Sequence, residues 1–228
     1  MKNKLFICSA TQGSRKDTLL FNTAQEGEFE VFFKENNTDS LAKVYNKAID
    51  FAIKENIDHI ILCHDDIILE NFDYIKLKKH FNDYDILGVA GASQIKVQEP
   101  ALWHLMGGGL GGGHLHGAVA HLDGSDKKTM TSFGPYPHKA VIMDGVFLAI
   151  SRKVFKKIRF DESCPSGFHF YDLQYTLDAS IAGYKCGVVD AYITHASPGL
   201  REFTKDWKEG QSWFLEKYKD YLGKTVQL

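Results

Sequence analysis

Two adjacent carboxylates, Asp65 and Asp66, follow the apolar run at residues 57–63, and His64 stands between the run and the pair. Neighbouring carboxylates that are partly buried repel each other and lose hydration, so they are tolerated where a cation or a shared proton compensates. Carboxylate oxygens suit Mg²⁺ or Mn²⁺, whose coordination is often completed by waters and substrate phosphates. The pair therefore indicates a metal site, and the alternative is a solvated turn at a strand end.

Two later residues could act at the same place. His195 follows the apolar run at residues 187–194 and is a candidate third ligand, although a lone histidine is more often structural. Asp172 begins a segment with apolar residues at every fourth position, which predicts a helix. It is either the N-cap of that helix or a general base that takes a proton from an incoming hydroxyl.

The elements that must position these residues alternate between strand and helix, which favours an α/β layered fold with a central, mostly parallel sheet flanked by helices. We expect strands at residues 5–9, 29–33, 57–63, 86–90, 118–122, 141–150 and 187–194. We expect helices at residues 41–56, 74–81, 152–158, 172–183 and in the C-terminal segment after residue 203. In open α/β sheets ligands gather beyond the carboxyl ends of the strands, where the acidic pair and His195 would lie.

The middle of the chain carries weaker signals. A dinucleotide-binding loop follows a strand and opens a helix, and the glycine-rich segment 107–113 lacks that context, so we expect a mobile lid instead. Trp103 beside it stacks on a sugar or packs in the core. His114 and His116 would share one side of a strand, as a second metal site or as a polar loop surface.

Composition limits the classes of protein. The chain has 228 residues, 44% of them hydrophobic, and a formal net charge of -2, which favours a folded core and argues against nucleic acid as a partner. No run has the length of a membrane span or a signal peptide, and the four cysteines show no paired metal spacing, so we expect a cytoplasmic protein with free thiols. The aromatic and lysine-rich segment 201–222 packs on the protein or, less favoured, lies on a membrane.

The order of these segments resembles the GT-A glycosyltransferases, particularly the family 2-like group of inverting enzymes. The matching segments, which cover about residues 3–200, are NNTDSLAKVYNKAI, IILCHDDIIL in the place of the Asp-x-Asp motif, MDGVFLAISRKVF, FHFYDLQYTLDASIAGYKCGVV in the place of the Glu-Asp motif, and THAS with the late histidine. The chain departs from the pattern at three places. His64 replaces the first acid of the Asp-x-Asp motif, Tyr171 replaces the Glu before the catalytic Asp, and Asn36 and Asn37 replace an acid that often contacts the base.

The resemblance implies a GT-A fold, which is Rossmann-like, in one domain over residues 1–228. Residues 1–90 would form the nucleotide-sugar-binding half, residues 91–200 the acceptor and catalytic half, and residues 201–228 a C-terminal helix. It further implies a metal-dependent inverting transfer of a sugar from a nucleotide-sugar, preferably a UDP-sugar, to a hydroxyl of a glycan or lipid-linked acceptor. The expected cofactor is Mn²⁺ or Mg²⁺, and the expected role is surface glycan biosynthesis.

The resemblance also assigns residues. It implies that Asp172 is the catalytic base and that Asp66 and His195 hold the metal. The donor-binding residues would be Ser9, Ala10, Thr11, Asn36, Asn37, Lys43, Asn46, His64 and Asp65, and the acceptor-side residues Trp103, Asp144 and Gly145. Two other functions remain open: a nucleotidyltransferase that acts on a sugar phosphate and releases pyrophosphate, and a non-catalytic sugar-binding module of the same fold.

Overall fold

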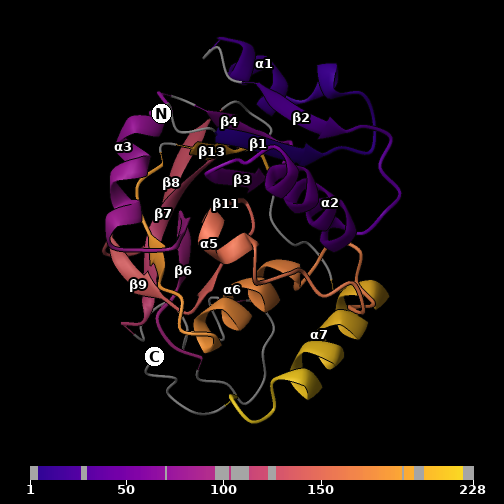
Figure 1. The fold of residues 1–228 in the computed structure, drawn as a ribbon, viewed down its shortest axis with the longest axis vertical. Helices are drawn as coiled ribbons and strands as arrows, with labels where there is room; N and C mark the ends of the chain where they lie inside the picture. Colours follow the sequence, from indigo (N-terminus) through magenta and orange to yellow (C-terminus); the bar gives the residue numbers. More distant parts are fainter. Residues whose placement is uncertain are drawn as a thin grey trace.

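Two sheets form the centre of the protein (Figure 1). The computed structural model describes residues 5–26, 30–69, 71–95, 103, 113–122, 127–191, 193–197 and 203–222. The first sheet has seven strands in the order β2 (Val31–Lys34), β1 (Leu5–Ala10), β3 (His59–Cys63), β11 (Phe147–Ser151), β5 (Ile86–Gly88), β12 (Cys186–Val188) and β9 (His138–Ala140). Only β11 and β9 run against the other five, so the mostly parallel central sheet is confirmed.

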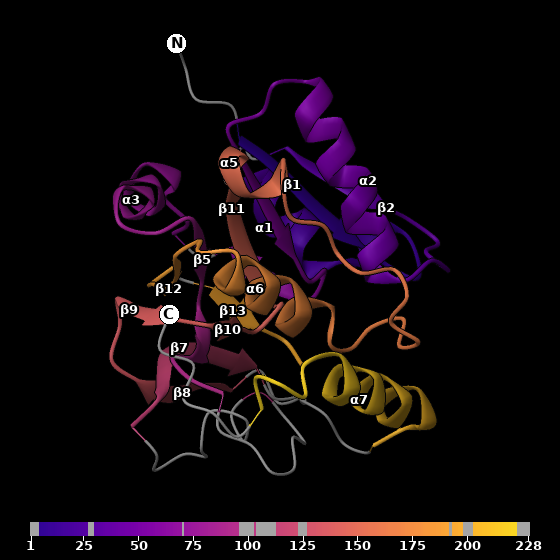
Figure 2. The same ribbon diagram turned by 60° about the horizontal axis from the view of Figure 1, so that its bottom comes forward.

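The second sheet is smaller and mainly antiparallel. Its order is β10 (Ile142–Met143), β6 (Ala90–Ala92), β7 (Leu115–Leu122), β13 (Ile193–His195) and β4 (Ile67–Leu69), with β8 (Lys128–Gly134) paired to β7. The exception is β13, which runs parallel to β7. In Figure 2, β7 and β8 lie on one side of α6 (Tyr171–Ile181), and β1, β2 and α2 (Leu41–Lys54) lie on the other.

Side-chain caps mark the starts of three helices, at Ser40, Asp73 and Thr204. Besides α2 and α6, the structure has the helices α1 (Leu19–Glu26), α3 (Tyr74–Lys79), α5 (Arg152–Phe155) and α7 (Lys205–Lys217), with single 3-10 turns at Arg15–Asp17 and His80–Asn82. The Ser40 side chain caps α2 by accepting a hydrogen bond from the Lys43 N–H, and Asn56 follows its end with φ 57°. Gly183, with φ 85°, follows α6 in the same way. Except for α1, these helices were expected from the sequence, and the expected ends of α2, α3, α5 and α6 differ from those observed by at most three residues.

Three expected strands are each divided between the two sheets. The run at 86–90 becomes β5 and β6, the run at 141–150 becomes β10 and β11, and the run at 187–194 becomes β12 and β13. In the second and third runs a polar residue, Asp144 or Asp190, lies where the chain crosses from one sheet to the other, whereas the run at 86–90 contains no polar side chain at its crossing. The helix α1 and the strands β4, β8 and β9 were not expected from the sequence.

Burial on both faces of the first sheet fixes the position of the carboxyl end of β3, which leads into the acidic pair. Ile60 and Leu62 belong to the apolar cluster beneath α2, whereas Ile61 and Cys63 belong to the cluster on the opposite face. Each of these side chains is at most 1% exposed. Because β3 has no solvent-facing side, the acidic pair that follows it is held at a fixed place and direction. All four cysteines are buried and free.

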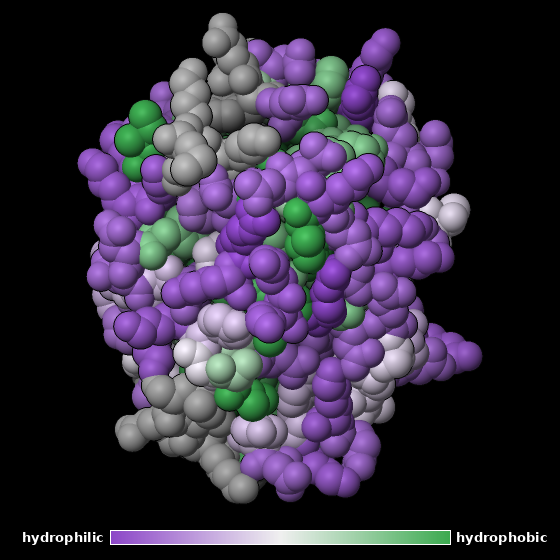
Figure 3. All heavy atoms as spheres, in the orientation of Figure 1, coloured by the Kyte–Doolittle hydropathy of each residue, from purple (hydrophilic) through white to green (hydrophobic). Residues whose placement is uncertain are grey.

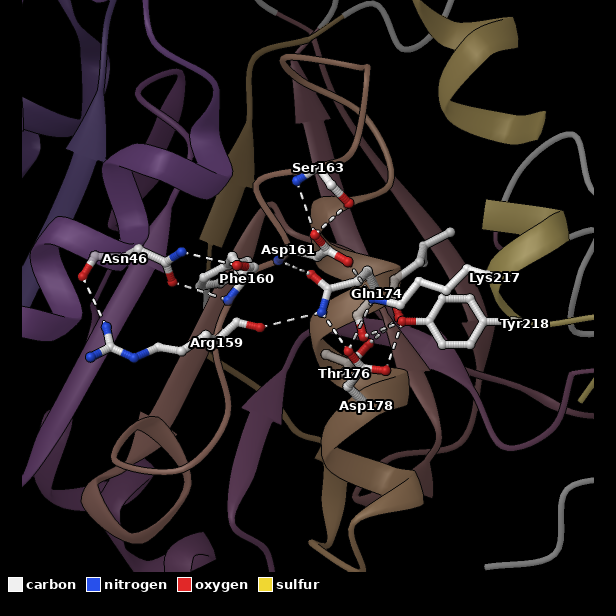
Figure 4. A network of polar contacts seen from close by, with 11 residues as sticks. Asn46, Arg159, Phe160, Asp161, Ser163, Gln174, Thr176, Asp178, Lys217 and Tyr218 are labelled. Carbon is white, nitrogen blue, oxygen red and sulfur yellow. Dashed lines mark hydrogen bonds and ion pairs between the residues drawn. The ribbon is translucent and has the colours of Figure 1, made fainter. Parts of the chain in front are cut away.

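A polar network joins α2, the segment 159–163, α6 and α7 (Figure 4). The buried Gln174 side chain accepts from the Asp161 N–H at 2.8 Å and donates to the Asp178 carboxylate at 2.7 Å. The Tyr218 hydroxyl donates to the same carboxylate, also at 2.7 Å. On the other side Asn46 exchanges hydrogen bonds with the Phe160 backbone. The network fixes α7 and the segment before α6 against the sheet.

The outer surface shows no broad apolar area on the face in Figure 3, where hydrophobic side chains form only small, separate groups. Within the segment 201–222, which was expected to pack or to lie on a membrane, residues Lys205–Lys217 form α7, and this helix buries Trp207, Gly210 and Phe214 against the protein. Within the part of the chain that the structure describes, no helix combines the length and the apolar character that a bilayer span requires.

Candidate active site

The acidic pair lies where the chain passes from one sheet to the other. The strand β3 ends at Cys63 and β4 begins at Ile67, so only three residues connect the two sheets here. The strand β13 pairs with β4 so that His195 lies opposite Ile67, and the Ala196 N–H donates to the Asp66 carbonyl at 2.9 Å. This pairing brings the late histidine back to the acidic pair.

His64, Asp66 and His195 form a cluster whose ligand atoms all lie within 4.8 Å of one another. His195 Nε2 is 3.2 Å and His64 Nδ1 is 3.9 Å from the same oxygen, Asp66 Oδ1. Both Asp66 Oδ1 and His195 Nε2 are buried, and neither atom has a hydrogen-bond partner with suitable geometry among the described residues. Burial of a polar atom without a hydrogen-bond partner costs free energy. An imidazole nitrogen and a carboxylate oxygen are common metal ligands, so these residues fit a divalent cation.

The protonation states of His64 and Asp66 favour metal binding. Burial lowers the pKa of His64, and the charge of Asp66 opposes that effect only in part, so the imidazole is neutral near pH 7. Burial raises the pKa of Asp66, but the contact with His195 and the nearby histidine charges outweigh it, and the pKa lies below its usual value. A neutral imidazole and an ionised carboxylate are the forms that bind metals.

Asp172 lies in the first turn of α6 but is not its N-cap. The N-cap is Phe170, a non-glycine residue with φ 67°, in the left-handed region. Asp172 Oδ2 accepts from the Gly145 N–H at 2.7 Å, and Oδ1 accepts from the Leu173 N–H at 2.9 Å. These two donors hold the carboxylate in one orientation.

Burial raises the pKa of Asp172 to about 7, and the negative charge of Asp144 acts in the same direction. The backbone donors at Leu173 and Gly145 oppose the increase. A carboxylate that titrates near the working pH has a pKa suited to a general base.

The cluster and Asp172 face one pocket of about 430 Å³. Asp144 lines it as well, and its Oδ2 accepts from Trp103 Nε1 at 2.7 Å. The remaining lining residues include the aromatic side chains of Trp103, Phe133, Phe168, Phe170, Tyr171 and Trp207. The structure therefore brings together six of the residues assigned from the sequence: His64, Asp66, Trp103, Asp144, Asp172 and His195.

Gly145 lies beside the pocket through its backbone. Its N–H donates to Asp172, and its carbonyl accepts from the Tyr171 hydroxyl at 3.3 Å. A Cβ atom at this position would overlap the Tyr171 hydroxyl and lie 2.8 Å from Asp172 Cβ, so only glycine fits. The close approach explains the glycine in MDGVFLAI.

The proposed donor residues form a second group along β1, β2 and α2. Ser9 is buried and donates to the Cys63 carbonyl at 2.8 Å, and the Asn37 N–H donates to the Thr11 carbonyl at 2.9 Å. Lys43 pairs with Asp39, and Asn46 binds Phe160 and Glu162. None of the residues Ser9, Ala10, Thr11, Asn36, Asn37, Lys43, Asn46 and Asp65 lines the 430 Å³ pocket. Their contact with a donor stays a prediction.

Sequence reasoning missed His121. This residue lies on β7 directly opposite His195 in the parallel pairing, with ring centroids 5.8 Å apart, and it lines the pocket. Burial lowers its pKa, as does the charge of His195. The sequence did contain a signal for this residue. The alternation of apolar residues predicts a strand at 118–122, and His121 is a polar residue near the end of that strand.

The other histidines do not form a second metal site in the described part of the chain. His116 is buried, stacks on His138 with ring centroids 3.5 Å apart, and has Nε2 3.1 Å from Ser93 Oγ. The cluster of His64, Asp66 and His195 is the only group of three potential metal ligands found among the described residues. Of the glycine-rich segment 107–113, all but Gly113 lies outside those residues, so the lid is not described.

The chain belongs to a glycosyltransferase-like family, whose model matches residues 20–218. It is therefore a glycosyltransferase with a GT-A-like fold, as the resemblance implied. No curated protein sequence matches the chain.

Solved structures are similar only at low identity. The crystal structure of A197 from STIV has a TM-score of 0.51 and 12% identity, and the match covers 88% of this chain and 98% of that chain. HddC from Yersinia pseudotuberculosis has a TM-score of 0.36 and 14% identity over 92% of this chain and 79% of that chain. A putative glucose-1-phosphate thymidylyltransferase from Bacillus anthracis, in complex with a sucrose, has a TM-score of 0.39 and 11% identity over 91% and 95%. At 12% identity the similarity to A197 concerns the fold alone. The TM-scores of the other two structures, 0.36 and 0.39, are too low for a conclusion about this chain.

Proposed function

We propose that the protein is a metal-dependent inverting glycosyltransferase that moves a sugar from a nucleotide-sugar to an acceptor hydroxyl. The observation that carries the proposal is that Asp172 and the cluster of His64, Asp66 and His195 face the same pocket. We further propose a UDP-sugar as donor and a glycan or lipid-linked acceptor, in surface glycan biosynthesis in the cytoplasm.

The proposed base is Asp172. Its carboxylate takes the proton of the acceptor hydroxyl as the oxygen attacks the anomeric carbon from the face opposite the leaving group. The N–H groups of Gly145 and Leu173 hold the carboxylate in position for this step. Inversion requires only one base, whereas glycoside hydrolysis ordinarily uses two carboxyl groups that flank the bond.

The proposed metal ligands are Asp66 and His195. A bound Mn²⁺ or Mg²⁺ supplies positive charge that stabilises the departing nucleoside diphosphate. The Asp66 side chain is 39% exposed although its Oδ1 is buried, so the carboxylate reaches from the histidines to the solvent-accessible pocket. The aromatic side chains of Trp103 and Phe168 provide flat apolar surfaces for a sugar ring.

The test is thermal unfolding with nucleoside diphosphates, with and without Mn²⁺. We expect UDP with Mn²⁺ to raise the Tm of the wild-type protein and of Asp220→Ala, an exposed control, but not that of Asp66→Ala. Saturation at 100 times the Kd stabilises by about 2.7 kcal/mol, which is roughly 5–10 °C for a domain of this size. If no nucleotide or metal changes the Tm of the wild-type protein, the proposal is wrong.

The released product separates the enzyme classes. With a nucleotide-sugar and an acceptor, we expect a nucleoside diphosphate in the medium. Pyrophosphate released from a nucleoside triphosphate would show a nucleotidyltransferase instead. Binding of a sugar without turnover would show a non-catalytic module.

A further inference from the structure

Two residues that depart from the glycosyltransferase pattern contact each other. His64 Nε2 lies 3.1 Å from the Tyr171 hydroxyl oxygen, although the two residues are 107 positions apart in the chain. The Tyr171 side chain is buried, and the His64 side chain is only 14% exposed. The histidine that replaces the first acid of one motif is thus paired with the tyrosine that replaces the Glu of the other.

The Tyr171 hydroxyl has two polar neighbours, His64 Nε2 at 3.1 Å and the Gly145 carbonyl oxygen at 3.3 Å. A phenol has one proton, and when it is donated to the carbonyl, the phenol oxygen accepts from a protonated His64 Nε2. In that arrangement His64 Nδ1 keeps a free lone pair.

That lone pair lies on the side of the metal cluster. His64 Nδ1 is 3.9 Å from Asp66 Oδ1, and the ring centroids of His64 and His195 are 5.4 Å apart. The backbone holds this arrangement, because β11 pairs with β3 and the His64 N–H donates to the Val146 carbonyl at 3.1 Å, next to Gly145. A histidine that binds a metal through one nitrogen usually donates from the other, which fixes the ring and its tautomer.

We infer that His64 is a third metal ligand through Nδ1, in place of a carboxylate, and that Tyr171 is the positioning residue that holds it in the binding tautomer. This inference rests on the proposed function, since it concerns the same metal site. It changes the assignment of His64 from a donor contact to a ligand.

The ligand set has a consequence for metal choice. Two imidazoles and one carboxylate suit transition metals better than Mg²⁺, which prefers oxygen ligands. Mn²⁺ is therefore expected to bind more tightly than Mg²⁺. Replacement of His64 by aspartate is expected to shift the preference towards Mg²⁺.

The first experiment measures Mn²⁺ binding by calorimetry without nucleotide, on wild-type protein, Tyr171→Phe and Tyr45→Phe. Tyr45 is a matched control, because it is a buried tyrosine whose hydroxyl donates to the Cys63 carbonyl at 3.2 Å and whose ring lies 5.6 Å from that of Tyr171. We expect the Kd of Tyr171→Phe to rise by about 10–100-fold, as for other partners of metal-binding histidines, and that of the control to stay near the wild-type value. Equal affinities for the two variants would overturn the role of Tyr171.

The decisive measurement of the second experiment is made on the wild-type protein, so it does not depend on whether a variant folds. Pulsed electron paramagnetic resonance of Mn²⁺ bound to the wild-type protein should show couplings to two directly bound imidazole nitrogens, and His64→Gln should lose one of them. A single nitrogen coupling in the wild-type protein would overturn the assignment of His64 and leave the proposed function intact. Absence of Mn²⁺ binding to the wild-type protein would overturn both.

Discussion

At the residue scale, Asp172 shows how position decides between two roles of one side chain. Its carboxylate accepts from Gly145 and Leu173 and does not cap α6, so the cap interpretation of this aspartate is wrong. Its pKa near 7 lies above the value of about 3.9 for an unfolded chain. Protonated Asp172 therefore stabilises the folded state fully at pH below about 4. This contribution to the free energy of unfolding is lost as the pH rises through about 7.

The pH dependence of turnover has the opposite sign. A general base acts in its ionised form, so turnover should increase as the pH rises through about 7, where Asp172 loses its proton. A pH profile of kcat from about pH 5 to 9 measures this increase. A profile that is flat through pH 7 would contradict the assignment of Asp172 as the base.

The variant Asp172→Asn removes the base without a large change in shape. We expect turnover to fall by about 10²–10⁴-fold, the usual contribution of a general base. The matched control is Asp83→Asn, at an exposed position after the 3-10 turn His80–Asn82, and it should keep wild-type turnover. The measurement is steady-state release of nucleoside diphosphate, and full activity of Asp172→Asn would rule out this base.

The site residues that could be predicted from the sequence are acidic residues and histidines that stand next to the ends of expected strands and helices. Asp66, Asp172 and His195 were assigned in this way, and they face one pocket. The contact between His64 and Tyr171 could not be predicted, since it depends on how β3, β11 and α6 meet in space. The assignments along β1 and α2 stay predictions, because they require a bound donor.

At the element scale, α7 supports the segment that leads into Asp172. Phe170 has a left-handed backbone, which costs free energy in a non-glycine residue, and its ring packs against Trp207 and Phe214 of α7. The Asp206 carboxylate accepts from the Ser166 hydroxyl at 2.7 Å. The helix thus stabilises a strained residue two positions before Asp172, the proposed base.

Gly210 allows α7 to approach this closely. A Cβ atom there would lie 2.8 Å from Ser166 Cβ and 2.9 Å from Phe170 Cδ2. Alanine is normally better than glycine within a helix, but we expect Gly210→Ala to lower the free energy of unfolding by about 1–3 kcal/mol through overpacking. Urea denaturation measures the change.

The control for this variant is Gly167→Ala. A Cβ atom at Gly167 meets nothing within 4 Å, so its unfolding free energy should remain close to the wild-type value. Equal stability of the two variants would mean that α7 does not press on the Phe170 segment.

Long, strongly patterned elements such as α2 were predictable because one helix face carries the apolar residues and Ser40 and Asn56 mark the ends. The crossing within residues 86–90 was not, because a residue buried in either sheet has the same apolar character, and in the other two divided runs only Asp144 and Asp190 mark the crossing. Short antiparallel strands such as β9 have only three residues, too few to show a period.

At the scale of the whole molecule, the network around Gln174 links elements from both ends of the chain (Figure 4). The division of the chain into a donor half and an acceptor half stays a prediction, but α2 and α7 are both fixed to the segment 159–163 through this network. Loss of Gln174 would remove one hydrogen-bond partner from the Asp161 N–H, the Arg159 carbonyl and the Asp178 carboxylate.

Gln174→Met tests this link, since methionine fills similar space without the amide. We expect the free energy of unfolding to fall by about 2–4 kcal/mol, because the Asp161 N–H and the Asp178 carboxylate lose a partner. The corresponding fall in Tm is roughly 5–15 °C for a domain of this size. Gln25→Met, at an exposed position of α1, is the control and should change the Tm little. A Tm equal to that of the control would show that the network adds no stability.

The pairing of β13 with β4 sets His195 beside Asp66. It therefore also determines when the cluster of His64, Asp66 and His195 is completed during synthesis of the chain. The ribosome makes Asp66 first, then Asp172, and then His195. At 5–20 residues per second, the interval from Asp66 to His195 is on the order of ten seconds. Until β13 emerges and adds to the sheet, a nascent chain lacks one of the cluster's three side chains. A chain terminated before β13 would therefore lack one of the proposed metal ligands.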